Sequence, residues 1–217
     1  MEFIVNNLPL YKEALILTLS LGFWGTLFSF IIGLLCSVIS YYKIKGLKRI
    51  VSLYIELSRN TPLLIQLFFL YFGLPQLGIM ISSYTCAIIG ITFLGGSYMA
   101  EAIRGGLESV SRTQVEAGLS VGLTQYQVTR YVIFPQAMAT ALPSIGANVI
   151  FLLKETSVVS VVALADLMFV AKGLIGMYYK TNEALFLLVM AYLIILLPTS
   201  LLFTFLERRL RYAGFGR

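Results

Sequence analysis

The sequence predicts an all-α membrane protein with about five transmembrane helices. Of its 217 residues, 59% are hydrophobic and only 12% are charged, and the mean hydropathy is +0.88. Soluble domains average about 25% charged residues. The hydrophobic residues form runs long enough to cross a bilayer, and the basic residues gather at the ends of these runs. These observations together predict one transmembrane domain over residues 1–217.

Five apolar runs define the expected spans, and each connector between them is short or polar. The fourth run is too long for one straight crossing, and Pro143 and Gly146 predict a break in its helix. In the first run, Gly22, Gly25 and Gly33 are small residues that let helices approach closely. The spans are expected at about 14–42, 51–74, 84–103, 136–169 and 183–206.

The net charge of +6 reflects membrane topology, and it gives no reason to expect nucleic acid as a partner. If the N-terminus lies outside, only Lys12, Lys172 and Lys180 share that side, and Lys154 lies within a span. The positive-inside rule therefore predicts an outside N-terminus and a cytoplasmic C-terminus. The basic residues placed in the cytoplasm are Lys43, Lys45, Lys48, Arg49, Arg59, Arg104, Arg112, Arg130, Arg208, Arg209, Arg211 and Arg217.

Composition also argues against catalysis by this chain. It contains no histidine, which disfavours most zinc, haem and serine-hydrolase sites. Cys36 and Cys86 lie inside apolar runs, so no disulfide framework or metal site is expected. The chain has no phosphate-binding loop of the G-x-x-x-x-G-K-[ST] type. It has no internal repeat of the kind common in secondary transporters, so it is expected to dimerise in order to enclose a path.

Residues 113–135 form the longest stretch with the polarity of a soluble segment. They predict a short helix, a glycine turn and a second helix. Gly122 can take the left-handed conformation that ends the first helix, and Pro135 must close the second. Three capping pairs mark the expected helix starts: Ser111 with Gln114, Thr113 with Glu116, and Thr124 with Gln127.

The same stretch resembles the EAA loop of ATP-binding-cassette (ABC) importer permeases. Glu116-Ala117, then Gly122, then 132–135 (V-I-F-P) follow its spacing, and Gly118 stands where the family has alanine. The resemblance implies a type I ABC importer permease fold, and it makes this loop the segment that docks on an ATPase subunit. An ordinary amphipathic connector is the structural alternative. The implied ATPase-coupling residues are Glu116, Ala117, Leu119, Ser120 and Gly122.

Further blocks resemble the subfamily that transports polar amino acids. Asn60 replaces the usual glycine of one block, and Glu155 replaces the usual aspartate of another. Independently of the resemblance, Arg59 can pair with Glu56 or a lipid phosphate, and Glu101 can pair with Arg104 one helical turn away. The four blocks are R-N-T-P-L-L-I-Q-L-F-F at 59–69, S-Y-M-A-E-A-I-R-G-G at 97–106, K-E-T-S at 154–157 and E-R-R-L at 207–210.

Polar residues of the fourth run are candidates for the substrate path. A charge at the bilayer centre costs at least about 2.5–3.5 kcal/mol, so it must face a cavity or a partner. Glu155 and Asp166 are eleven residues apart, which would place both carboxylates on one face of a regular helix. They could attract a basic or zwitterionic ligand; satisfied structural pairs are the alternative. The substrate-path candidates are Glu155, Asp166, Asn148, Thr156 and Ser157.

The resemblance implies a permease subunit of an ATP-driven ABC importer for polar amino acids, of the histidine, glutamine, arginine or cystine type, in the bacterial inner membrane. The implied partners are an ABC ATPase that holds ATP–Mg, an extracellular or periplasmic amino-acid-binding protein, a second copy or related permease, and membrane lipid. The coupling loop would be cytoplasmic at about 105–135, and the chain itself would need no cofactor. The alternatives are an ABC permease for another small solute such as methionine, an ion-coupled carrier or channel, and, least favoured, a membrane-embedded enzyme.

Overall fold

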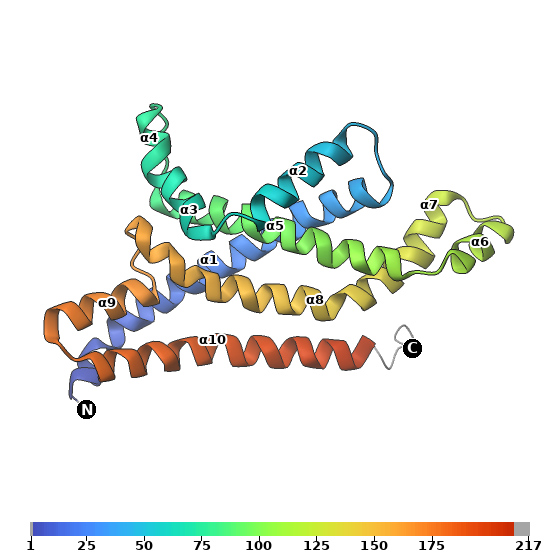
Figure 1. Cartoon of the computed structure of the whole chain (residues 1–217). Helices are drawn as coiled ribbons and strands as arrows, with labels where there is room; N and C mark the ends of the chain where they lie inside the picture. Colours follow the sequence, from blue (N-terminus) through green and yellow to red (C-terminus); the bar gives the residue numbers. More distant parts are fainter. Residues whose placement is uncertain (1, 211–217) are drawn as a thin grey trace.

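The computed structural model describes residues 2–210, and these residues form helices and short connections without a strand (Figure 1). Arg211 and Arg217 lie outside the described residues. The α-helices are α1 (Glu2–Tyr41), α2 (Leu47–Arg59), α3 (Leu63–Phe68), α4 (Leu74–Gln76), α5 (Ser83–Ser109), α6 (Arg112–Ser120), α7 (Gln125–Val128), α8 (Phe134–Glu155), α9 (Leu167–Tyr178) and α10 (Thr181–Leu210). Two π-helical segments, η1 (Phe69–Gly73) and η2 (Thr129–Ile133), and one 3-10 segment, η3 (Thr156–Val162), join them.

Four of the helical stretches described are long and apolar enough to cross a membrane: 3–41, 83–109, 125–162 and 181–210. The first starts well before the expected residue 14, and the Tyr11 hydroxyl near its start donates to the Ala184 carbonyl of α10 at 2.8 Å. Three of the five expected spans are therefore continuous helices, whereas the second is divided and the fourth is interrupted after Val162.

The expected second span is divided between α2 and a shorter apolar stretch, Leu63–Gln76. Pro62 has extended backbone (ψ 140°) and lacks an N–H, and a proline disfavours helical geometry in the residue before it. The Gln66 amide donates across the break to the carbonyls of Ser58 and Thr61 at 3.2 and 3.0 Å. The break is thus a well-bonded corner of the fold.

Two other prolines do not act as the sequence predicts. Pro135 does not close a helix, because the chain stays helical from Gln125 to Val162. The π-helical η2 ends at Ile133, two residues before Pro135, and the changed hydrogen-bond register of a π-bulge accommodates a residue without an N–H. The helix also continues through Pro143. The interruption comes instead at η3 and at Ala163, which has left-handed backbone (φ 58°).

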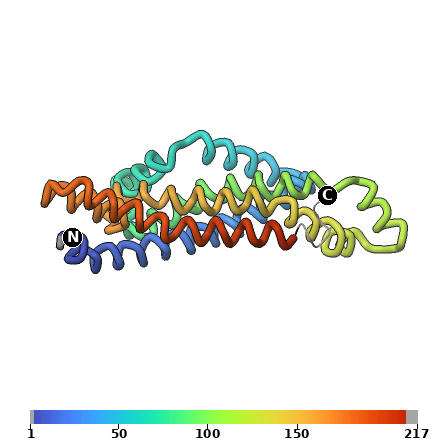
Figure 2. The backbone as a smooth tube through the Cα atoms, turned by 90° about the horizontal axis from the view of Figure 1, so that it is seen from below, coloured from blue at the N-terminus to red at the C-terminus, as the bar shows by residue number. Residues whose placement is uncertain are grey.

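The helices form one elongated bundle in which α1, α5 and α8 make the central core, and α9 and α10 pack beside α1 (Figures 1 and 2). The expectation for the glycines of α1 is confirmed. A Cβ at Gly25 would lie 2.5 Å from Ile91, and one at Gly33 would lie 2.4 Å from Met99. The missing side chain of Gly146 likewise leaves room for Phe203 of α10. The helix break predicted at Gly146 does not occur, because α8 continues through it. Close contact therefore explains why these positions are glycine.

Candidate coupling loop and substrate pocket

The loop between α5 and α8 projects beyond one end of the bundle, with α6 and α7 at its tip (Figures 1 and 2). Gly122 has φ +86°, as predicted. The Leu123 N–H donates to the Gly118 carbonyl at 3.2 Å, and the Gly122 N–H donates to the Leu119 carbonyl at 3.0 Å. These two bonds are those of a helix end with a left-handed residue, a conformation that glycine adopts without steric cost.

Only one of the three capping pairs forms as expected. At the start of α7, the Thr124 N–H donates to Gln127 at 2.8 Å, and the Gln127 N–H donates to the Thr124 hydroxyl at 3.3 Å. Ser111 precedes α6 but makes no side-chain cap bond, and Thr113 lies inside that helix. The Gln114 side chain accepts from Gln136 of α8 at 2.7 Å, so it ties the loop to the bundle.

One face of α6 packs on α7 and η2, and the other is exposed. Gly118 is buried, and a Cβ there would lie 3.0 Å from Val128. The coupling candidates Glu116, Ala117, Leu119, Ser120 and Gly122 are all exposed. Val121 and Tyr126, which sequence reasoning did not single out, are the most exposed large apolar side chains of this loop, at 79% and 75%. The sequence feature that could have identified them is an aliphatic residue directly before the turn glycine and an aromatic residue four positions after it.

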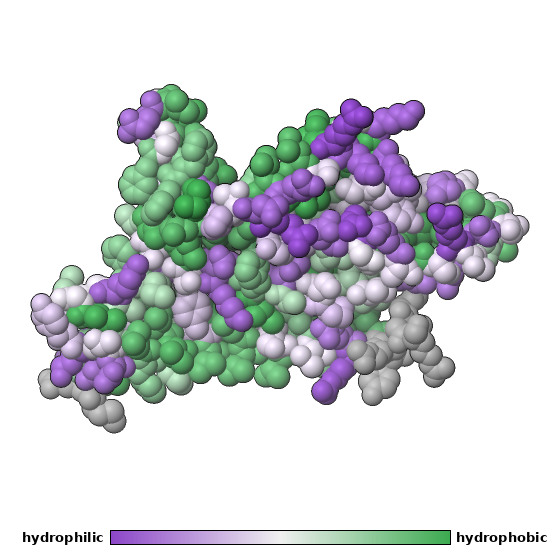
Figure 3. Space-filling view, in the orientation of Figure 1, coloured by the Kyte–Doolittle hydropathy of each residue, from purple (hydrophilic) through white to green (hydrophobic). Residues whose placement is uncertain are grey.

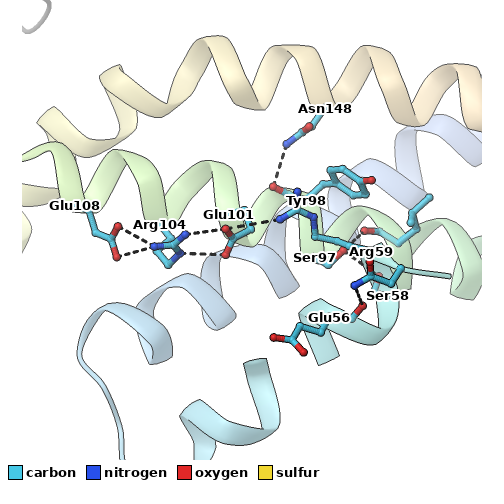
Figure 4. A network of polar contacts seen from close by, with 11 residues as sticks. Glu56, Ser58, Arg59, Ser97, Tyr98, Glu101, Arg104, Glu108 and Asn148 are labelled. Atoms are coloured by element: carbon cyan, nitrogen blue, oxygen red, sulfur yellow. Dashed lines mark hydrogen bonds and ion pairs between the residues drawn. The ribbon is translucent and has the colours of Figure 1, made fainter. Parts of the chain in front are cut away.

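A network of ion pairs joins α2 to α5 (Figure 4). The expected Glu101–Arg104 pair forms at 2.7 Å, and Arg104 also binds Glu108 at 2.8 Å. Arg59 lies 3.8 Å from Glu101, and its guanidinium lies 5.1 Å from the Tyr98 ring centre. Its protein partner is therefore Glu101, and the expected pairing with Glu56 is wrong.

A cavity of about 380 Å³ lies where the α2–α3 break faces α5 and α8. Arg59 and Glu155 both line it, and the Glu155 carboxylate makes no ion pair with any residue described. The Tyr98 and Phe151 rings, whose centres are 5.1 Å apart, provide aromatic surface. The remaining lining residues are Asn60, Thr61, Pro62, Leu63, Leu64, Leu94 and Val158.

Of the five substrate-path candidates, only Glu155 lines this cavity. Asn148 donates to the Tyr98 carbonyl at 3.1 Å and so joins α8 to α5, while Thr156 is buried and donates to the Leu153 carbonyl at 2.8 Å. Ser157 is half-buried in η3.

Asp166 does not share a helix face with Glu155, because the 3-10 segment and the left-handed Ala163 lie between them. It is fully buried at the start of α9 and accepts from the N–H groups of Met168 and Phe169 at 3.1 and 3.0 Å. The side chain therefore caps this helix, a role that needs an oxygen acceptor and not a negative charge.

This arrangement predicts different outcomes for two Asp166 variants. Asp166→Ala is expected to lower the free energy of unfolding by about 1–2 kcal/mol, because the α9 N–H groups lose their acceptor. Asp166→Asn keeps an acceptor, so we expect near-normal stability and uptake. Thermal unfolding in detergent and transport assays measure the two effects. A stable Asp166→Asn protein that fails to transport would place this carboxylate on the substrate path.

Comparisons with known proteins agree with this architecture. The chain is 36% identical to a probable amino-acid ABC transporter permease protein, PatM, of Vibrio harveyi over 88% of this chain and 87% of that protein. It is 32% identical to the glutamine transport system permease protein GlnP of Escherichia coli K12, with 94% of each chain covered.

Solved structures share the fold. An amino acid ABC transporter with histidines is 36% identical and superposes with a TM-score of 0.87 over 94% of this chain and 96% of its own. The MetNI methionine ABC transporter, at 22% identity, superposes with a TM-score of 0.79 over 94% and 97%, so the fold extends to it. The sequence pattern of the family described as "Binding-protein-dependent transport system inner membrane component" matches residues 25–212. The chain belongs to this family of membrane permease subunits, whose ATPase is a separate subunit.

Proposed function

We propose that this chain is the permease subunit of an ATP-driven importer for polar amino acids. The cavity between Arg59 and Glu155 carries the proposal. The names of the similar permeases, which include amino-acid and glutamine transporters, favour the same class of substrate.

The cavity supports recognition of a zwitterion. Arg59 presents a guanidinium that can bind an α-carboxylate through two parallel hydrogen bonds. Glu155, without an ionic partner among the described residues, can bind an α-ammonium or a cationic side chain. Tyr98 and Phe151 offer apolar surface in the same cavity. A mostly apolar pocket with a few convergent polar groups is the usual form of a small-molecule site.

The polar face of the subunit supports assembly as a dimer. Hydrophilic side chains cross the middle of the face shown in Figure 3, between hydrophobic regions. In the ion-pair network of α2 and α5, the Arg59 side chain is 43% exposed and the Glu101 side chain is 29% exposed. Because charges facing lipid are costly, we infer that a second copy or a related permease covers this face. The translocation path then lies between the two subunits.

The coupling loop is the proposed docking site for the ATPase subunit, which holds ATP–Mg; we propose no cofactor for this chain. The exposed coupling candidates, together with Val121 and Tyr126, form its contact surface. The loop follows α5, which carries Tyr98, and leads into α8, which carries Glu155. At the base of the loop, a Cβ on Gly106 would lie 2.3 Å from the Ala137 carbonyl. A push on the loop would therefore move two walls of the cavity together.

We propose that the N-terminus faces outward and the loop faces the cytoplasm. The basic residues of the α1–α2 turn lie at the same end of the bundle as the loop (Figure 1), in agreement with the positive-inside rule. The substrate-binding protein would then deliver its amino acid at the opposite end, beside α9 and the start of α10.

Reconstitution in liposomes tests the proposal against its alternatives. The chain is assembled with its ATPase, and the amino-acid-binding protein is supplied outside. Uptake of labelled glutamine, arginine or histidine is expected to require both ATP and the binding protein. Uptake driven by a proton or sodium gradient without the ATPase would establish an ion-coupled carrier. Uptake that methionine alone competes for would establish the other substrate class.

A further inference from the structure

An apolar groove lies on the side of α2 away from the ion-pair network. It has a volume of about 610 Å³ and lies between α1, α2 and α5. Every lining side chain is apolar except those of Thr92 and Tyr54, and the Tyr54 hydroxyl donates to the Phe93 carbonyl at 2.8 Å. Ile32 and Cys36 form one wall, and Ile50 forms part of the facing wall. The surface of the groove therefore suits an acyl chain.

The α1–α2 turn at one end of this groove is strongly basic. Its positive side chains are all exposed, and none makes an ion pair with a residue that the structure describes. The sequence has no acidic residue between Glu13 and Glu56. Ile50, which lines the groove, directly follows the last basic residue. The basic residues of the turn are Lys43, Lys45, Lys48 and Arg49.

We propose that this face holds one anionic phospholipid, with an acyl chain in the groove and the headgroup phosphate at the basic turn. Lys and Arg near a membrane surface each attract anionic lipid by about 1 kcal/mol, and four of them lie within seven residues. Lys43 and Lys48 also line a polar cavity with Glu56, Glu101 and Glu108 on the opposite side of α2. The headgroup site is therefore placed at Lys45 and Arg49, next to the groove wall at Ile50.

A second copy of the chain is a poorer occupant of the same groove. An isologous contact brings the same patch of both subunits together. It would place two basic turns at one interface, and the neighbouring stretch 14–55 supplies no acidic residue to pair with them.

The bound lipid would brace α2 against α1 and α5. The groove wall and the pocket wall are parts of the same helix, because Ile50 and Tyr54 line the groove and Arg59, at the end of α2, lines the substrate cavity. The lipid would therefore hold one wall of that cavity in position. This role rests on the proposed function, whereas lipid binding itself does not.

Native mass spectrometry of the purified transporter, released from a mild detergent, tests lipid binding. Phosphatidylglycerol is compared with phosphatidylcholine of the same acyl chains. The triple variant Lys45→Gln/Lys48→Gln/Arg49→Gln is expected to lower phosphatidylglycerol retention at least about tenfold, with phosphatidylcholine retention unchanged. The matched control, Arg208→Gln/Arg209→Gln, removes basic side chains from α10 and should leave retention of both lipids unchanged.

A second variant tests the groove. Ile50 is 65% exposed, so Ile50→Gln should fold, and it is expected to reduce retention of both lipids. The proposal is overturned if the wild type retains the two lipids equally, or if the triple variant behaves as the control does. It is also overturned if Ile50→Gln dissociates the dimer without changing lipid retention, since a second copy would then cover the groove. If the wild-type transporter retains lipid as expected but does not import amino acids, that result counts against the proposed function alone.

Discussion

Gly122→Val is expected to lower ATP-driven uptake at least about tenfold. At φ +86°, a β-branched residue clashes with its own backbone, and left-handed geometry costs an ordinary residue about 1–2 kcal/mol. About 1.4 kcal/mol changes an equilibrium tenfold. The substitution therefore favours loops in which the two hydrogen bonds to Gly118 and Leu119 are broken, and the exposed residues of the turn lose the arrangement that is proposed to contact the ATPase.

The structure separates backbone strain from crowding at this position. Apart from Gly122 itself and its two chain neighbours, no residue has an atom within 4 Å of a Cβ built on Gly122, so crowding by the surrounding structure is not the problem. Gly122→Asn should keep most of the uptake, because asparagine tolerates left-handed backbone. Gly105 also has open space around its Cβ position, but it lies within α5, and Gly105→Ala is the matched control.

Two measurements distinguish lost coupling from a lost fold. Co-purification from membranes should show that Gly122→Val no longer retains the ATPase, while Gly122→Asn and Gly105→Ala do. Thermal unfolding of the isolated permease should change little in all three variants, because the loop projects from the bundle. A Gly122→Val transporter that holds its ATPase and transports normally would show that this turn is not the coupling surface.

The prolines show what the sequence predicts and what it does not. Pro62, Pro135 and Pro143 each lack an N–H. The sequence predicts breaks at Pro135 and Pro143, and it predicts one span across Pro62. Only Pro62 breaks its helix, and there the side chains around it bond the corner. The π-helical turn before Pro135 has no sequence signature of its own. The apolar spans are predictable because bilayer thickness fixes their length; breaks within them depend on packing.

The candidate site shows the same division. The left-handed Gly122 and the Thr124–Gln127 cap depend on neighbouring residues, and both were predictable. The position of Arg59 was not, because its partner Glu101 lies 42 residues away in the sequence and the nearer Glu56 was an equally good choice. The prediction that Glu155 and Asp166 share a helix face assumed a regular helix. A short 3-10 segment between them makes that prediction wrong.

Glu155→Gln is expected to lower the maximal rate of uptake about ten- to a hundredfold. A hydrogen bond to a charged group contributes about 1.5–3 kcal/mol, and the substrate ammonium would lose one in the cavity. Arg59→Gln should have an effect of similar size through the carboxylate. Lys154→Gln is the matched control, because Lys154 adjoins Glu155 but is exposed and does not line the cavity.

The measurement must separate the cavity from the binding protein that precedes it. Uptake is therefore followed with saturating binding protein, and ATP hydrolysis is recorded in the same liposomes. If the two side chains bind opposite ends of one zwitterion, Arg59→Gln should reduce uptake of every amino acid alike. Glu155→Gln should reduce uptake of cationic amino acids more than that of neutral ones, because a cationic side chain is the second group that this carboxylate can bind. If both variants import amino acids with the rate and selectivity of Lys154→Gln, the cavity is not part of the transport path. Arg59 would then have only its structural contacts to Glu101 and Tyr98.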